Sequence, residues 1–152
     1  MSPRSVRRLA EAMLRELELE TAELSVLLTH DSTIQRLNRL HRGKDRPTDV
    51  LAFPLDDAAD AGGERWLGDV VISLDTAQRQ ADARRRPLVN EVRFLLAHGI
   101  LHLIGFDHDV PARKRRMDAM AKKLVRSAPI ELVLAPRAPE RQPSVKKKRA
   151  RP

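Results

Sequence analysis

Three of the chain's five histidines lie between positions 98 and 108, at spacings that suit a metal ion. His98 and His102 are four residues apart, so on a helix both imidazoles lie on one face, one turn apart. Gly105 is the residue type at which helices commonly stop and turn, and His108 follows it closely enough to fold back toward the other two. Three neutral imidazoles around one point, with an open position for water, are typical of catalytic zinc sites. The pattern predicts such a site.

The residue after His98 limits what this metal site can catalyse. The spacing His-x-x-x-His-x-x-Gly-x-x-His equals that of the zinc ligands in metzincin proteases, which carry a glutamate base directly after the first histidine. Here that position is Gly99, and glycine cannot accept a proton. The sequence therefore predicts a metal site that lacks the general base of a peptidase.

Two other interpretations of the histidines stay open. They could be helix histidines satisfied by hydrogen bonds, although three at ligand spacing favour a metal. A structural zinc is the second alternative, because Asp107 or Asp109 could supply a fourth ligand and close the site. The chain has no cysteine, so a tight site must use imidazole and carboxylate groups. We expect one Zn²⁺ per chain, although Ni, Cu and Fe also suit imidazole ligands.

Glu91 lies seven residues before His98 and would share its helix face. From there it could orient an imidazole from outside the ligand shell. The alternative is an ordinary exposed glutamate in the first turn, where the helix dipole favours a negative charge.

The hydrophobic pattern predicts an α+β fold, with a small mixed sheet packed against helices. The segment from Val92 to Ile104 is apolar on nearly all sides, so we expect a central buried helix that carries the three-histidine site. Residues 55–65 are rich in Asp, Ala and Gly and predict an exposed loop. The expected helices are 5–19, 31–41, 75–85, 87–104 and 110–126, and the expected strands are 23–29, 48–54, 67–74 and a short one at 130–134.

Composition is that of a soluble globular protein, with 41% hydrophobic and 33% charged residues in 152. We expect one domain over residues 1–135 and a basic, disordered tail over 136–152, where proline, lysine and arginine leave little to bury. No signal peptide or membrane-spanning stretch is evident, which favours a cytoplasmic protein.

Positive charge is concentrated at the end of the chain. Residues 137–152 carry seven basic groups and one acid, and so account for +6 of the net charge of +8. The tail either adds nonspecific affinity for a polyanion or only improves solubility. Three further basic segments are either contacts to a polyanion or solvated surface: 42–46, 84–86 and 113–126.

Three segments in order resemble the YbeY family of bacterial endoribonucleases. They are His98-Gly-Ile-Leu-His-Leu-Ile-Gly-Phe-Asp-His108, the stretch from Leu37-Asn38 through Arg42-Gly-Lys-Asp-Arg-Pro-Thr-Asp-Val-Leu-Ala-Phe-Pro54, and Leu67-Gly-Asp-Val-Val-Ile-Ser73. The likeness covers about residues 5–126. Ala52 and Phe106 stand where serine and tyrosine are common in the family, and each lacks the hydroxyl. Family members usually begin with a short strand, so we expect a sheet with one strand fewer.

The resemblance implies a single-domain, metal-dependent, single-strand endoribonuclease. It implies action in ribosomal RNA processing, at the 3′ end of the small-subunit RNA, and in ribosome quality control. Partners would be a ribosomal RNA precursor and the small ribosomal subunit, with no DNA or membrane partner. The family's metal ligands correspond to His98, His102 and His108, and its important arginine corresponds to Arg42. All four are therefore expected to be catalytic.

Arg42 is suited to hold a phosphate, because guanidinium binds phosphate with two parallel hydrogen bonds and keeps its charge. The alternative for Arg42 is an ion pair within its loop, with Asp45 or Asp49. Two other functions also stay open. One is a ribosome assembly factor without catalysis, in which zinc is structural, and the other is a metal hydrolase of a different substrate class.

Overall fold

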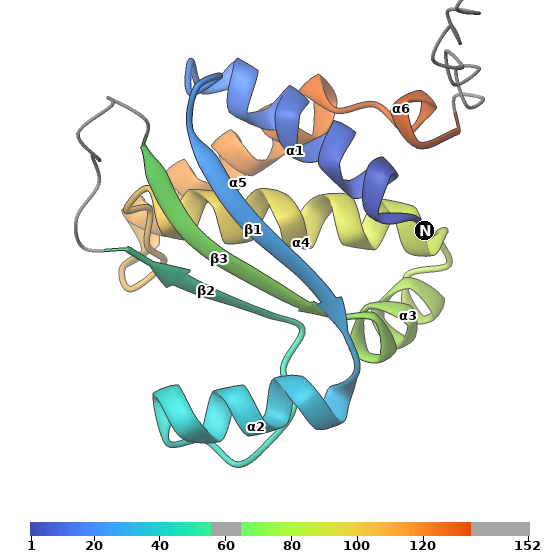
Figure 1. Cartoon of the computed structure of the whole chain (residues 1–152), viewed down its shortest axis with the longest axis vertical. Coiled ribbons are helices and arrows are strands. Elements are labelled where there is room, and N and C mark those ends of the chain that lie inside the picture. Colours follow the sequence, from blue (N-terminus) through green and yellow to red (C-terminus); the bar gives the residue numbers. More distant parts are fainter. Residues whose placement is uncertain (56–64, 135–152) are drawn as a thin grey trace, which may run out of the picture.

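The fold is a three-stranded mixed sheet with helices on both faces, shown by a computed structural model that describes residues 1–55 and 65–134 (Figure 1). α4 crosses one face of the sheet with α1 and α5 beside it, and α2 lies against the other face. The elements in chain order are α1 (Pro3–Glu16), β1 (Glu23–Thr29), α2 (Asp31–Arg42), β2 (Val50–Pro54), β3 (Trp66–Ser73), α3 (Leu74–Ala83), α4 (Leu88–Leu103), α5 (Pro111–Ser127) and α6 (Glu131–Leu134).

The strand order is β1-β3-β2, so β3 is central and the other two strands form the edges. β1 runs parallel to β3, with Val26 opposite Val70. β2 runs antiparallel to β3, with Ala52 opposite the same Val70. Val70 thus lies at the middle of the sheet, where its side chain is fully buried against α4.

Local sequence explains where the helices that carry the site begin and end. α4 starts directly after Pro87, whose extended backbone suits the residue before a helix. α2 ends at Gly43, which has a left-handed backbone with φ of 68°, a conformation that glycine adopts at little cost. Gly105 has φ of 99° and turns the chain away from the end of α4. The turn predicted at Gly105 is therefore confirmed.

The centre of the core is α4, as the run of apolar residues predicted. Its fully buried side chains include Val92, Leu96, Ile100 and Leu101. At Gly99 the helix comes so close to the sheet that an added Cβ would lie 2.5 Å from Cγ1 of Val70. Only glycine allows this approach without movement of a buried valine.

The segment 130–134 was predicted as a strand, and this prediction is wrong. Residues Glu131–Leu134 form the short helix α6, which packs on α1, where Arg8 Nη1 donates a 3.4 Å hydrogen bond to the Leu132 carbonyl. A five-residue segment with four apolar residues does not by itself distinguish strand from helix, and the segment lies against α1 rather than beside a strand.

The other predicted helices and strands are confirmed with small shifts at their ends; the second strand begins at Val50 rather than Thr48. Most of the predicted loop over 55–65, and the predicted tail over 136–152, lie outside the described residues. Within residues 1–55 and 65–134, no helix is both long and apolar enough to cross a membrane.

Candidate functional site

His98 is held in one orientation by its own helix. Its Nδ1 lies 3.0 Å from the carbonyl oxygen of Phe94, one turn earlier, and its ring packs on the Phe94 ring at a centroid distance of 4.2 Å. Because a carbonyl oxygen only accepts, this contact places the hydrogen on Nδ1 and leaves the Nε2 lone pair available. The side chain is only 18% exposed. Nε2 is thus the nitrogen that His98 could offer to a metal ion.

His102 and His108 meet across the turn that Gly105 makes. Their ring centroids are 5.3 Å apart, with the rings edge to face. The turn is fixed by two backbone hydrogen bonds, from Gly105 N to the His102 carbonyl at 3.2 Å and from Phe106 N to the Leu101 carbonyl at 3.0 Å. His102 is partly buried, whereas the His108 side chain is 63% exposed. The predicted return of His108 toward α4 is therefore observed.

The surroundings of His102 favour its neutral form. Burial lowers the pKa of His102 first, and the neighbouring imidazoles of His108 and His98 lower it further. Asp107 and a backbone hydrogen bond at Phe106 act in the opposite direction but do not cancel this effect. A neutral imidazole is the form that binds a metal ion.

The three imidazoles do not surround a single position where a metal ion could be bound. Among the described residues, no three His, Asp or Glu side chains are close enough together to hold a metal ion. The donor chemistry nevertheless fits a divalent transition metal, because His98 offers Nε2 and His102 is kept neutral. His108 is the exposed member of the set, whereas His98 and His102 are partly buried.

Asp118 on α5 is the acidic residue that faces this cluster, and the sequence analysis missed it. Its Oδ1 lies 3.8 Å from Nε2 of His98, the nitrogen that would face a metal. Asp107 is 3.9 Å from Nδ1 of His108, while Asp109 pairs with Arg113 at 2.9 Å and is turned to that partner. One sequence signal could have found Asp118, because it is the only acid in the otherwise basic helix α5.

Arg42 is the last residue of α2, and its side chain reaches the edge of the sheet. Its Nη2 donates a 3.1 Å hydrogen bond to the carbonyl of Ala52 on β2. Among the described residues it forms no ion pair, since Asp45 bonds Gln35 and Asp49 bonds Gln80. The alternative of a loop ion pair is therefore wrong.

The sheet connects Arg42 to the histidines. Ala52 lies opposite Val70, and Val70 touches Gly99, the residue after His98. The ends of α2, β2 and α4 also point to the same side of the molecule, on the left in Figure 1. α2, which ends with Arg42, and α4, which carries His98 and His102, thus end toward the same end of the sheet, on opposite faces of it.

A model of the family described as Endoribonuclease YbeY matches residues 2–128. The chain belongs to the YbeY family. Curated YbeY proteins of Myxococcus xanthus and Persephonella marina, both named Endoribonuclease YbeY, are 51% and 49% identical over 117 and 104 residues. These matches cover 76% and 68% of this chain, but only 40% and 68% of the two relatives.

A solved structure has the same fold as this YbeY chain. A solution structure of a Thermotoga maritima protein superposes with a TM-score of 0.58 at 29% sequence identity. The match covers 82% of this chain and 78% of the other. The α+β fold class expected from the sequence is therefore confirmed.

Glu91 has neither of the two roles predicted for it. It is fully buried rather than exposed, and it binds two arginines rather than a histidine. Arg84 Nη1 lies 2.6 Å from Oε1, and Arg86 Nη2 lies 2.6 Å from Oε2. Two of the three arginines in the predicted basic segment 84–86 thus serve to join the end of α3 to the start of α4 in this YbeY fold.

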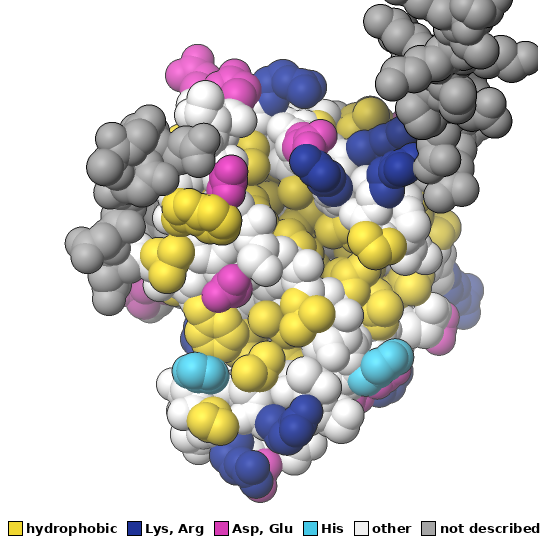
Figure 2. Space-filling model, viewed as in Figure 1, with side chains coloured by type: hydrophobic (Ala, Val, Ile, Leu, Met, Phe, Trp, Pro, Cys, Tyr) yellow, Lys and Arg dark blue, Asp and Glu magenta, His cyan; other side chains and the backbone are white. Residues whose placement is uncertain are grey.

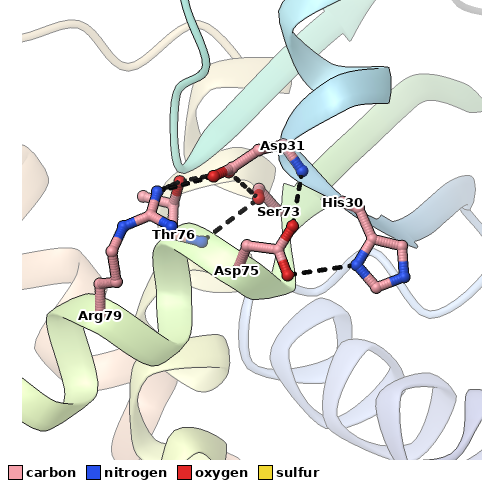
Figure 3. A network of polar contacts seen from close by, with 6 residues as sticks. All are labelled: His30, Asp31, Ser73, Asp75, Thr76 and Arg79. Carbon is pink, nitrogen blue, oxygen red and sulfur yellow. Dashed lines mark hydrogen bonds and ion pairs between the residues drawn. The ribbon is translucent and has the colours of Figure 1, made fainter.

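A second polar cluster lies where β1 and β3 end, and it is structural (Figure 3). Asp31 Oδ1 accepts hydrogen bonds from Ser73 Oγ at 2.6 Å and from Thr76 Oγ1 at 2.7 Å, and its Oδ2 pairs with Arg79 at 2.7 Å. Asp75 accepts from the backbone N–H of Asp31 at 2.9 Å and lies 3.2 Å from Nδ1 of His30. These groups satisfy one another and fix the starts of α2 and α3.

Proposed function

We propose that this chain is a metal-dependent endoribonuclease that cleaves single-stranded RNA during ribosomal RNA processing. Membership of the YbeY family supports the activity, and the relatives that match are named endoribonucleases. The observation that carries the proposal is the grouping of His98, His102 and His108 at the end of the sheet toward which α2, with Arg42 as its last residue, also ends. The 3′ end of the small-subunit RNA and ribosome quality control are the proposed settings.

His98, His102 and His108 would hold one Zn²⁺, each through a neutral imidazole nitrogen. When bound, the ion supplies a Lewis acid for a phosphoryl oxygen and lowers the pKa of its water to about 7. The Phe94 carbonyl keeps the His98 ring aimed through Nε2. Asp118, beside that nitrogen, adds a negative charge that favours retention of a cation.

Arg42 would hold the phosphate of the RNA chain. The hydrogen bond to the Ala52 carbonyl uses one guanidinium nitrogen and fixes the direction of the group, while the side chain remains exposed. Its other N–H groups can then form the paired hydrogen bonds that phosphate accepts. Charge that develops on the phosphate during cleavage would be stabilised there.

RNA would be held mainly through its backbone. The described part of the chain has few aromatic side chains for base stacking, and the whole chain has three Phe, one Trp and no Tyr. α5, which carries Asp118, also presents exposed basic residues: Arg113, Lys114, Arg115, Arg116, Lys122 and Lys123. The small ribosomal subunit is a fitting partner for such a surface.

The test is cleavage of a ribosomal RNA precursor fragment by protein whose zinc content has been measured. We expect the wild type to cut and both His98→Ala and Arg42→Ala to lose cleavage, the first with loss of zinc and the second with zinc retained. Arg4→Ala is the matched control, because Arg4 is an exposed arginine on α1 away from the cluster. Equal cleavage by all four folded proteins would contradict the proposal.

A second candidate is an RNA-binding assembly factor with a structural zinc. The observation in its favour is that Asp118 Oδ1 lies 3.8 Å from Nε2 of His98, where it could supply the fourth ligand that closes a structural site. It predicts that His98→Ala unfolds the chain and that the wild type binds RNA without cutting it. A peptidase is less favoured than either, because Val70 leaves no room for a glutamate side chain at position 99.

A further inference from the structure

β1 leaves one edge of the sheet open. In the described part of the chain it pairs with β3 alone, so the N–H and C=O groups along its other side have no strand partner. Natural edge strands are usually protected by lysine, proline or a covering helix. β1 reads Glu-Leu-Ser-Val-Leu-Leu-Thr and has one charged residue, at its start. The unpaired backbone groups and the low charge of β1 therefore make this edge able to pair with another strand.

An apolar groove runs beside the open edge, between β1 and α1. Its volume is about 800 Å³, and its walls include Val6, Ala10 and Leu14 from α1 with Leu24 and Val26 from β1. Figure 2 shows hydrophobic side chains gathered across the middle of this face, over β1 and between α1 and α2.

Further apolar residues border the open edge. Leu27 on β1 lines the groove and is 46% exposed, and the contacts of α2 with the sheet are to β2 and β3. Trp66, at the start of β3 beside Glu23, also lines the groove and is exposed. Apolar surface along an unpaired edge is what a new strand would cover.

We propose that two copies of this chain pair through β1, antiparallel about Val26, to form one continuous six-stranded sheet. In this register each of the seven residues has a partner: Val26 faces its own copy, Leu24 faces Leu28, Ser25 faces Leu27 and Glu23 faces Thr29. No like charges are opposite each other. Residues of the groove face meet only residues of the same face, as strand alternation requires.

The charges at the rim of the groove in one copy are complementary to the charges at the same rim in a second copy. Arg7 and Glu11 on α1 line it and are joined by a 3.0 Å ion pair. The two-fold axis of an isologous pair places the two α1 helices antiparallel on one side of the joined sheet. Arg7 of each copy would then be near Glu11 of the other, and the two grooves would become one covered interior.

The register gives a direct crosslinking test, because the chain has no cysteine of its own. Two residues at position 26 would have their Cα atoms about 4.5–5.5 Å apart, within the range that a disulfide spans. Val26→Cys is therefore expected to form a disulfide-linked dimer under mild oxidation. Ser25→Cys is the matched control, since two residues at position 25 would be more than about 7 Å apart.

Sedimentation of the full chain tests the pairing without a crosslink. The wild type is expected to sediment as a dimer. The double variant Ser25→Lys and Leu27→Lys places like charges opposite each other at exposed positions and should give a monomer. Ser25→Asp with Leu27→Lys, which places opposite charges there, should restore the dimer.

Three results would overturn this proposal. They are a monomeric wild type across the micromolar range, equal crosslinking at positions 25 and 26, and a dimer that Ser25→Lys with Leu27→Lys leaves intact. A monomer that binds a synthetic peptide of sequence Glu-Leu-Ser-Val-Leu-Leu-Thr would also overturn self-pairing, and would assign the edge to a strand from another source.

Discussion

The ring of His98 is oriented by Phe94, one turn earlier on α4. Phe94 contacts the His98 ring and its carbonyl accepts the Nδ1–H, and the guanidinium of Arg86 lies 5.8 Å from the centroid of the Phe94 ring. Arg86 is in turn held by the buried carboxylate of Glu91. The orientation of one candidate ligand therefore depends on residues a full turn and more away from it.

At the same scale, Gly99→Ala is expected to destabilise the protein. The new Cβ would lie 2.5 Å from Val70 Cγ1, and overpacking of this kind costs about 1–3 kcal/mol. The better helix propensity of alanine returns up to about 1 kcal/mol, so a net loss remains. Urea unfolding measures the change. In a Val70→Ala background the cost should shrink; the same cost in both backgrounds would show that this contact is not the cause.

The turn between α3 and α4 depends on one buried carboxylate. Glu91→Gln would keep the size of the side chain and remove the charge that Arg84 and Arg86 share. Loss of one partner from a buried ion pair costs about 3–5 kcal/mol, and the partial exposure of both arginines places this case at or below the lower end. Thermal unfolding measures the loss. Arg84→Ala, which leaves the Arg86 pair in place, should be milder.

The junction of β1 and β3 with the helices that follow them should respond to acid. Burial alone would raise the pKa of Asp31, but hydrogen bonds from Ser73, Thr76 and Arg79, with the charge of Arg79, outweigh it and lower the pKa from 3.8 to about 2. A folded-state pKa below the unfolded value means that the stabilisation is present above pH 3.8 and is lost as pH falls toward 2.

Asp31→Asn is expected to lower the melting temperature at neutral pH and to flatten the acid limb between about pH 4 and pH 2. Melting temperature against pH measures both effects. Asp69→Asn is the matched control, because Asp69 is exposed on β3 and outside the cluster. An unchanged acid limb in the Asp31 variant would assign the acid response to other carboxylates.

The same elements show what the sequence could and could not predict. Amphipathic spacing located the helices and strands that bury one face, and the histidine spacing located the pair His102 and His108, because both depend on residues close in the chain. The position of Asp118 beside His98 and the pairing of Glu91 with two arginines depend on how separate elements pack, and residue spacing within one element does not predict that packing. The strand prediction for 130–134 was wrong because the structure of a short, mostly apolar segment is decided by the elements that it packs against.

For the whole molecule, charge is distributed unevenly between the body and the end of the chain. Residues 137–152 hold +6 of the net +8, so they supply most of the long-range attraction to a polyanion. Removal of the chain from Pro136 onward is expected to weaken RNA binding at low salt and to reduce the slope of log affinity against log salt. Each lost phosphate contact changes that slope by about 0.7 for single strands.

Fluorescence anisotropy over a salt series measures the affinity and the slope together. A truncated protein with unchanged slope would show that residues 137–152 only improve solubility. Cleavage by the truncated protein should persist at low salt, because the residues assigned to the proposed site all lie before Pro136.

The contact between Gly99 and Val70 also sets the distance between α4 and the sheet, and this distance matters for the proposed cleavage. Arg42 is attached to the sheet through Ala52, and the histidines are attached to α4, so the two groups that would bind opposite parts of one phosphodiester belong to different layers. The spacing between α4 and the sheet at Gly99 therefore helps to set the distance between the guanidinium and the imidazoles, and so the size of phosphodiester that fits between them. A variant that separated the layers by a fraction of an ångström would keep every reacting group and its zinc, yet misalign them on the RNA.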